Sequence, residues 1–197
     1  MRKHISLLRR FGSDTTAASA AEFALVLPLM ILFFIGIIDA GYYMWQLNRA
    51  EKAVQIGARW AVATDMVPAN LRNYSFAVSG GIEQGTVVPE ASFPKVTCTS
   101  TSCTGQWGHS TTAFNSILTR LQQIKTGVAA SNLTVEYEWS GLGYAGDPNG
   151  PDVAPIVTVK LTGLTHTPIT SILFGTTNLP TFAYSLTAED SIGTFSN

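Results

Sequence analysis

Residues 17–38, AASAAEFALVLPLMILFFIGII, decide how this chain is organised. A carboxylate, Glu22, directly precedes a sixteen-residue run without a charged side chain, Phe23 to Ile38. Small residues precede this run, whereas an ordinary secretory signal carries its small-residue cleavage site after the apolar region. The reversed order indicates an export signal that is cut before the hydrophobic segment.

The apolar run predicts a helix that spans a membrane. With residues 39–45, DAGYYMW, it supplies about 20 residues, the length that crosses a bilayer, provided that Asp39 is tolerated. The two tyrosines and the tryptophan of this extension are typical of the outer membrane interface. Pro28 predicts a kink, because it removes a backbone donor and crowds the preceding turn. Asp39 has two interpretations, a place among the outer headgroups or a hydrogen bond inside a helix bundle.

The charges of the chain are unevenly distributed. Residues 1–17 contain four basic residues and one acidic residue, a net charge of +3. Because the formal net charge of the whole chain is −1, residues 18–197 carry −4. The positive-inside rule therefore places the N-terminus in the cytoplasm and the C-terminal part on the opposite side of the membrane. The acidic remainder gives no support to nucleic-acid binding.

Residues 46–64 continue the helix with a different pattern. Apolar side chains recur every three or four positions, at Leu47, Ala50, Val54, Ala58 and Ala61. This spacing is typical of an amphipathic helix. The stripe packs either on the chain's own globular part or on partner subunits, and the sequence leaves both open. Arg49 and Arg59 lie off the stripe and are expected to be solvated.

Residues 66–197 are expected to form an α+β head. The Gly- and Pro-rich residues 66–94 predict a loop with a short strand near 86–88. Thr111 and Thr112 are expected to cap a helix that runs to Lys125. Strands are predicted at 95–99, 133–139, 156–161 and 182–188, and in the last three the side chains alternate between two faces. A short helix or turn, TPITSILFG at 167–175, is expected before the last strand.

Two cysteines, Cys98 and Cys103, lie in a Ser- and Thr-rich loop. On the exported side of a membrane, a disulfide that closes this small loop is the favoured interpretation. A metal site that includes His109 would have three ligands, one fewer than the usual four. A pair of free thiols is the remaining alternative, and the spacing is not the Cys-x-x-Cys pattern of redox catalysts.

The sequence offers no pattern for catalysis or for a cofactor. Its three histidines, His4, His109 and His166, are far apart, and no phosphate-binding loop, zinc cluster or nucleophile elbow occurs. Asp147 and Asp152 raise the question of calcium, but the EF-hand spacing and its terminal Glu are missing. We therefore expect no enzymatic activity, no metal and no cofactor.

The segment around Glu22 resembles the processing site of the TadE-like family, minor pseudopilins of the tight-adherence (Tad, Flp-type) pilus system. The resemblance rests on AASAAEFALVLP, residues 17–28, and extends through residues 36–64. In pilins of this system the prepilin peptidase cuts five residues before a Glu that is followed by an aromatic residue. For Glu22 and Phe23 this implies a cut between Ala17 and Ala18. The family often has Gly before the cut, where this chain has Ala17.

The resemblance implies a role for Glu22 and a set of partners. The amine freed at Ala18 would pair with the Glu22 carboxylate of a neighbouring subunit, because a carboxylate inside a membrane costs about 2.5 to 3.5 kcal/mol and needs a partner. The alternative is an interfacial Glu that the helix dipole favours. The implied partners are the prepilin peptidase, other pilin or pseudopilin subunits and the Tad inner-membrane assembly platform.

These observations predict a pilin-like α+β protein with four parts. They are a basic leader peptide at 1–17, a transmembrane helix segment at 18–45, an amphipathic helix continuation at 46–65, and a periplasmic head of one helix on an antiparallel sheet at 66–197. The expected function is that of a minor pseudopilin, which leaves the inner membrane for a pilus or starts its assembly and takes part in surface adhesion. The alternatives are an unprocessed single-span envelope protein with a ligand- or partner-binding domain, and a tethered periplasmic enzyme.

Overall fold

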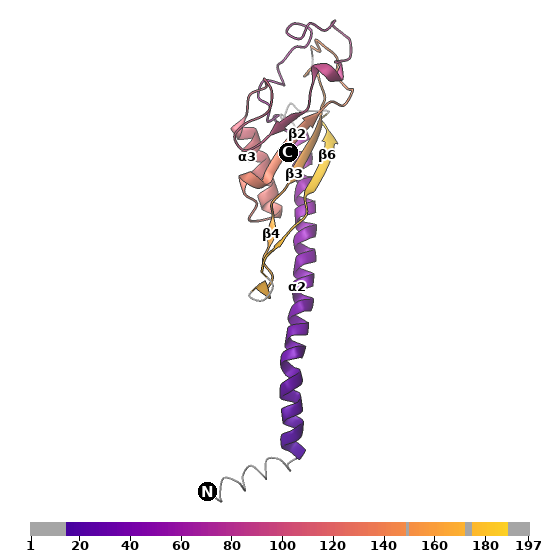
Figure 1. Cartoon of the computed structure of the whole chain (residues 1–197). Helices are drawn as coiled ribbons and strands as arrows, with labels where there is room; N and C mark the ends of the chain where they lie inside the picture. The colour runs from indigo at the N-terminus through magenta and orange to yellow at the C-terminus, as the bar shows by residue number, and fades with distance from the viewer. Residues whose placement is uncertain (1–14, 149, 172–174, 189–197) are drawn as a thin grey trace, which may run out of the picture. The chain divides into compact units, whose positions relative to one another are not determined.

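The computed structural model describes residues 15–148, 150–171 and 175–188, so residues 1–14 of the expected leader lie outside them. A long N-terminal helix, α2, runs from Thr15 to Ala63. A small antiparallel sheet with a second helix, α3, follows it (Figure 1). This arrangement confirms the predicted α+β, pilin-like fold.

The chain divides into two compact units. One unit contains α2 as far as Met44 together with the segment Thr167–Thr176. The other contains the rest of α2, from Trp45, and the head with its sheet. The long helix therefore contributes to both units, and its Asp39 and Arg49 have neighbours in different ones.

The head sheet has the strand order β1-β2-β3-β6 and is antiparallel throughout. The strands are β1 Val96–Cys98, β2 Leu133–Glu138, β3 Ile156–Leu161 and β6 Phe182–Thr187. Val135 and Tyr137 of β2 and Val157 and Val159 of β3 are fully buried, as the predicted alternation requires. The four predicted strands are confirmed to within one residue at each end.

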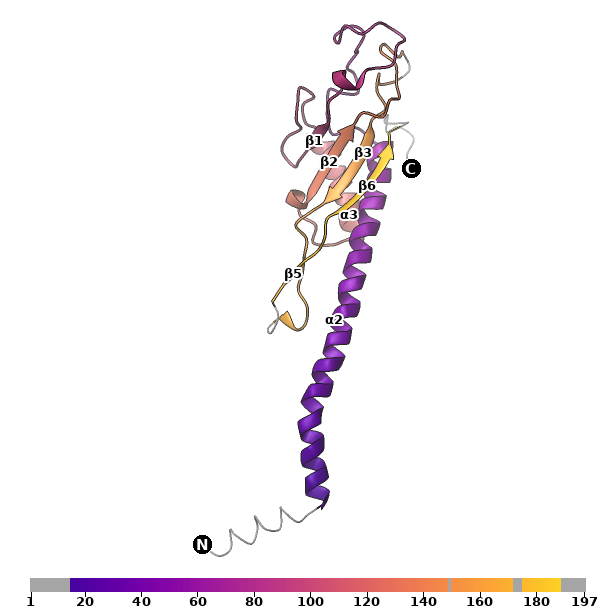
Figure 2. The ribbon, with the colours of Figure 1, turned by 45° about the vertical axis from the view of Figure 1, so that its right-hand side comes forward.

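Helix α3, Thr111–Ile124, and the last turns of α2 lie on one face of the sheet (Figure 2). The buried side of α3 consists of Ala113, Phe114, Ile117 and Leu121. Gly57 lets the two helices approach closely, since a Cβ atom there would lie 2.8 Å from Leu121 Cδ2 and 3.4 Å from Val159 Cγ1. The predicted helix is confirmed, but Ser110 caps it in place of the two threonines, because the Ser110 side chain accepts a hydrogen bond from the Ala113 N–H.

The second half of α2 packs on its own head. The buried apolar side chains of this half are those of Ala50, Ala53, Val54, Ala58 and Ala61, each at most 1% exposed. Small side chains on this stripe bring the helix backbone close to the sheet and α3. Of the two alternatives for this stripe, packing on the chain's own globular part is therefore the one observed.

Arg49 is a correction to the sequence analysis, which expected it to be solvated. Its Nε donates a hydrogen bond to the Ile124 carbonyl at 2.6 Å, and its Nη2 donates to the same oxygen. Its guanidinium also lies 4.7 Å from the centre of the Trp45 ring. A cation at the end of α3 satisfies a carbonyl that the helix leaves without an internal partner, so packing holds Arg49 in place. Arg59, by contrast, is exposed as expected.

Residues 66–94 contain no α-helix or strand but fold over an aromatic cluster of Tyr74, Phe76, Phe93 and Trp107. Ring centres in this cluster are 4.8 to 6.4 Å apart. In place of the strand expected near residues 86–88, Val87 makes one isolated bridge to Tyr144. A loop prediction from composition therefore missed the part of the core that this segment supplies.

Short elements complete the described chain. Two three-residue 3₁₀ turns are η1 Glu90–Ser92 and η2 Ala130–Asn132. A two-stranded ribbon, β4 Thr165–His166 and β5 Thr177–Asn178, was not predicted. It leads into and out of the segment Thr167–Thr176, whose described part contains a turn at Ile169 and Thr170, as the sequence suggested.

Candidate functional site

The expected processing segment lies in the first turns of α2. Ala17 and Ala18 are both within the helix, and Glu22 and Phe23 follow with exposed side chains. Positions 18 and 22 are four residues apart, so they lie on one side of the helix and about 6 Å apart along its axis. A cut before Ala18 would thus free an amine one helical turn from the Glu22 carboxylate.

The apolar part of α2 after Glu22, Phe23 to Ile38, is exposed except at Ile35, which is half-buried. An apolar stretch of 18 residues in this helix contains no buried residue. The helix continues through Pro28. It is long and apolar enough to cross a membrane, which is consistent with a single-pass membrane protein.

Asp39 interrupts the exposed surface because its side chain is buried, with 8% exposed. Its Oδ1 accepts a hydrogen bond from the Ile169 N–H at 2.6 Å. Its Oδ2 accepts from the Thr170 N–H at 2.9 Å and from the Thr170 hydroxyl at 2.6 Å. These donors belong to a turn of the same chain, which neither sequence interpretation of Asp39 anticipated.

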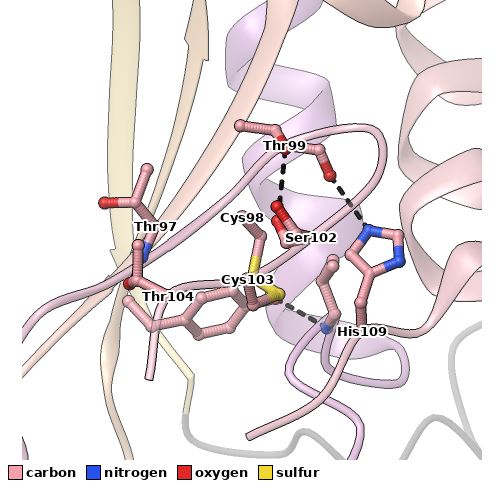
Figure 3. Close-up of a disulfide and its surroundings, with 9 residues drawn as sticks. Thr97, Cys98, Thr99, Ser102, Cys103, Thr104 and His109 are labelled. Atoms are coloured by element: carbon pink, nitrogen blue, oxygen red, sulfur yellow. Dashed lines mark hydrogen bonds between the residues drawn. A yellow bond between two sulfur atoms is a disulfide. The ribbon is translucent and has the colours of Figure 1, made fainter. Parts of the chain in front are cut away.

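Cys98 and Cys103 form a disulfide, as expected. Backbone hydrogen bonds reinforce the loop, from the Thr99 N–H to the Ser102 carbonyl and from the Thr104 N–H to the Thr97 carbonyl. Figure 3 shows the disulfide with Thr99, Ser102 and His109 beside it. His109, the third candidate metal ligand, places its Nε2 2.9 Å from the Thr99 carbonyl oxygen. The two cysteines therefore close the end of β1, and the histidine supports the same loop.

Asp152, one of the two residues considered for calcium, is an anchor for backbone amides. Its Oδ2 accepts a hydrogen bond from the Phe76 N–H at 2.6 Å, and its Oδ1 accepts from the Asp147 N–H at 3.1 Å. The side chains that line a neighbouring cavity of about 400 Å³ include Arg72 and Tyr74. Within residues 15–148, 150–171 and 175–188, no group of three or more His, Cys, Asp or Glu residues is placed to hold a metal.

A charged cluster joins Lys95, which directly precedes β1, to side chains of β2 and β3. Lys95 Nζ lies 2.7 Å from both Glu136 Oε2 and Glu138 Oε1, and Lys160 Nζ lies 2.6 Å from Glu136 Oε2. Burial raises the pKa of Glu136, but hydrogen bonds and charges from Lys160 and Lys95 lower that pKa more, so it lies below its ordinary value. Hydrogen bonds to Glu136 and Glu138 raise the pKa of Lys95. The cluster thus favours the charged forms of Glu136 and Lys95.

The comparison with known protein families found a match to the N-terminal segment. The model of the TadE-like protein family matches residues 17–59, which include Glu22 and most of α2. No curated protein and no solved structure matches the chain. The match confirms the predicted resemblance of residues 17–59 to the TadE-like family.

Proposed function

We propose that this chain is a minor pseudopilin of a Tad pilus system, which the prepilin peptidase cuts between Ala17 and Ala18. The observation that carries the proposal is the match of residues 17–59 to the TadE-like family. Within that segment, small residues, Glu22 and an exposed apolar helix follow one another in the order that processing before the span requires. The role is structural, and no catalytic activity is proposed.

The exposed first half of α2 supports assembly through helix packing. Large apolar side chains such as Phe33 and Leu25 are 66% and 81% exposed. An apolar surface of this length needs lipid around it or the helices of other subunits. Since the second half packs on the head, the first half is the part left for exchange between a bilayer and a fibre.

Glu22 would direct that exchange. Once the leader is removed, the amine of Ala18 carries a positive charge at the start of the helix, and a neighbour's Glu22 carboxylate is its natural partner in surroundings of low dielectric constant. Neither charge is stable alone among apolar helices, so processing and docking are coupled. The basic leader places the uncut protein in the inner membrane with its head in the periplasm, where the assembly platform and other pilin subunits receive it.

The proposal is tested with a C-terminally tagged full chain produced with and without its prepilin peptidase. Intact mass and N-terminal sequencing should show a new N-terminus at Ala18 only when the peptidase is present. Among the cut chains, those of the variant Glu22→Ala should stay in the membrane fraction instead of the sheared pilus fraction. The control Glu51→Ala removes an exposed carboxylate farther along α2 and should behave as the wild type.

An uncut N-terminus in every sample would overturn the proposal. The protein would then be a single-span envelope protein whose head binds a ligand or partner. Equal recovery of Glu22→Ala and wild type in pili would leave processing intact but would refute the assembly role of the carboxylate.

A further inference from the structure

We infer that the turn Pro168–Ser171 docks into the outer leaflet of the membrane beside the α2 span, to which Asp39 ties it. The inference rests on the proposed function in one respect, that the first half of α2 crosses a membrane. The occupant of the surface is lipid.

The turn covers one face of the helix. Among residues 19–44, for which the structure describes burial, the side chains that are not exposed are Ile35, Asp39 and Tyr43. They are spaced four apart and therefore share a helix face. The turn belongs to the same compact unit as this face, and it lies beside α2 in both views (Figures 1 and 2).

The backbone N–H groups of the turn all donate hydrogen bonds within the protein. Pro168 has no N–H, and the Ile169 and Thr170 N–H groups donate to Asp39. The Ser171 N–H donates to the Pro168 carbonyl at 3.0 Å. Irregular backbone survives at membrane depth when protein groups satisfy it, and this turn meets that condition for its donors.

The position of Asp39 along the helix sets the depth of the turn in the membrane. Asp39 directly follows the apolar run that ends at Ile38, and Tyr42 comes three residues later, about 4.5 Å along the helix axis. Tyrosines are enriched where the hydrocarbon meets the headgroups. A turn that donates to Asp39 therefore lies at the headgroup boundary or just below it, in the leaflet on the head's side.

The surface that the turn presents is apolar at Ile169. Ile169 donates its N–H to Asp39 while its side chain stays 60% exposed. The Asp39 charge, which lipid would penalise, is enclosed by three donors. An exposed isoleucine beside a carboxylate whose charge is stabilised by three hydrogen bonds, continuous with the apolar helix, fits acyl chains better than it fits water.

The test uses the full chain in phosphatidylethanolamine and phosphatidylglycerol vesicles, with the native disulfide intact. A single added cysteine, Ile169→Cys, carries an environment-sensitive fluorophore, and spin-labelled lipids quench it from the headgroup level or from mid-chain. Leu32→Cys in the span and Val78→Cys, at a head position that is 86% exposed, are the controls. We expect the probe at position 169 to be quenched mainly by the headgroup-level label, the probe at 32 by the mid-chain label, and the probe at 78 by neither.

Releasing the turn should remove the signal. Asp39→Asn leaves one acceptor oxygen in place of two, and quenching at position 169 should fall toward the level at position 78. Glu51→Gln, which removes an exposed carboxylate from the same helix, should leave quenching unchanged. Thr170→Val, which removes only the hydroxyl donor, should cause a smaller loss than Asp39→Asn.

The outcomes separate the inference from the function on which it rests. Quenching at position 32 without quenching at 169 would overturn the inference and leave the membrane span standing. Absence of quenching at both positions would overturn the span and the inference together. Unchanged quenching in Asp39→Asn would overturn the role of Asp39 as the tie.

Discussion

Replacing Asp152 by alanine is expected to destabilise the head more than any comparable change at its surface. The carboxylate is buried, with 4% exposed, and accepts hydrogen bonds from the backbone of Phe76 and Asp147. It thereby joins the connection between β2 and β3 to residues 66–94, the aromatic loop. Losing it leaves both backbone donors without their partner.

The two hydrogen bonds do not contribute equally. Phe76 is buried, so its N–H cannot turn to water, and the loss combines a charged hydrogen bond of about 1.5 to 3 kcal/mol with an unsatisfied donor. Asp147 is exposed, so its N–H regains a water partner at little cost. We expect Asp152→Ala to lower the free energy of unfolding by about 2 to 4 kcal/mol, a large share of a typical 5 to 15 kcal/mol. Asp152→Asn retains one acceptor oxygen and should lose about 1 kcal/mol.

The assay is equilibrium urea unfolding of the full chain in detergent, followed by tryptophan fluorescence. Trp107 is a local reporter, since its ring centre lies 6.0 Å from that of Phe76. The control is Asp65→Ala, which removes an exposed ion pair with Arg72 and should cost at most about 1 kcal/mol. If Asp152→Ala loses no more stability than Asp65→Ala, the anchoring role of the buried carboxylate is refuted.

Two further predictions concern the sheet and the helix contact. The pKa of Glu136 is lowered in the folded head, so its contribution to stability is present above its unfolded pKa near 4.5 and is lost as the pH falls through the folded pKa. Unfolding of Glu136→Gln should therefore differ from wild type at neutral pH but converge with it in acid, and a constant difference would contradict this. Gly57→Val should lower the free energy of unfolding by about 1 to 3 kcal/mol through overpacking on Leu121. Gly41→Val, where a Cβ meets no atom within 4 Å, should not change unfolding of the head, and equal losses in both variants would point to helix propensity alone.

Much of the fold is encoded in short-range patterns. The apolar run after Glu22 predicts the long helix, and alternation at residues 133–139 and 156–161 predicts β2 and β3 with their correct buried faces. The disulfide was predicted from two cysteines in a short Ser- and Thr-rich loop. Each of these features depends on residues that are near neighbours in sequence, so the period or spacing is enough to reveal it.

The contacts that sequence analysis missed join distant segments. Asp39 and Ile169 are 130 residues apart, and Asp152 and Phe76 are 76 residues apart. Arg49 likewise contacts Ile124 from 75 residues away. In each case a charged or polar side chain satisfies a backbone group, and any exposed turn or helix end offers such groups. No local pattern identifies which one will be chosen.

The sequence by itself determined the order of the parts: a small-residue segment, Glu22, an apolar helix, an amphipathic helix and an α+β head. These depend on composition and period, which act over one or two turns of helix or a few residues of strand. Only the tertiary structure decided that Asp39 holds the turn at Pro168–Ser171, that Arg49 donates to the last carbonyl of α3, and that Asp152 anchors the aromatic loop. The physical reason is that a buried polar group must find a partner, and the choice among many equivalent partners is made by packing of the whole chain.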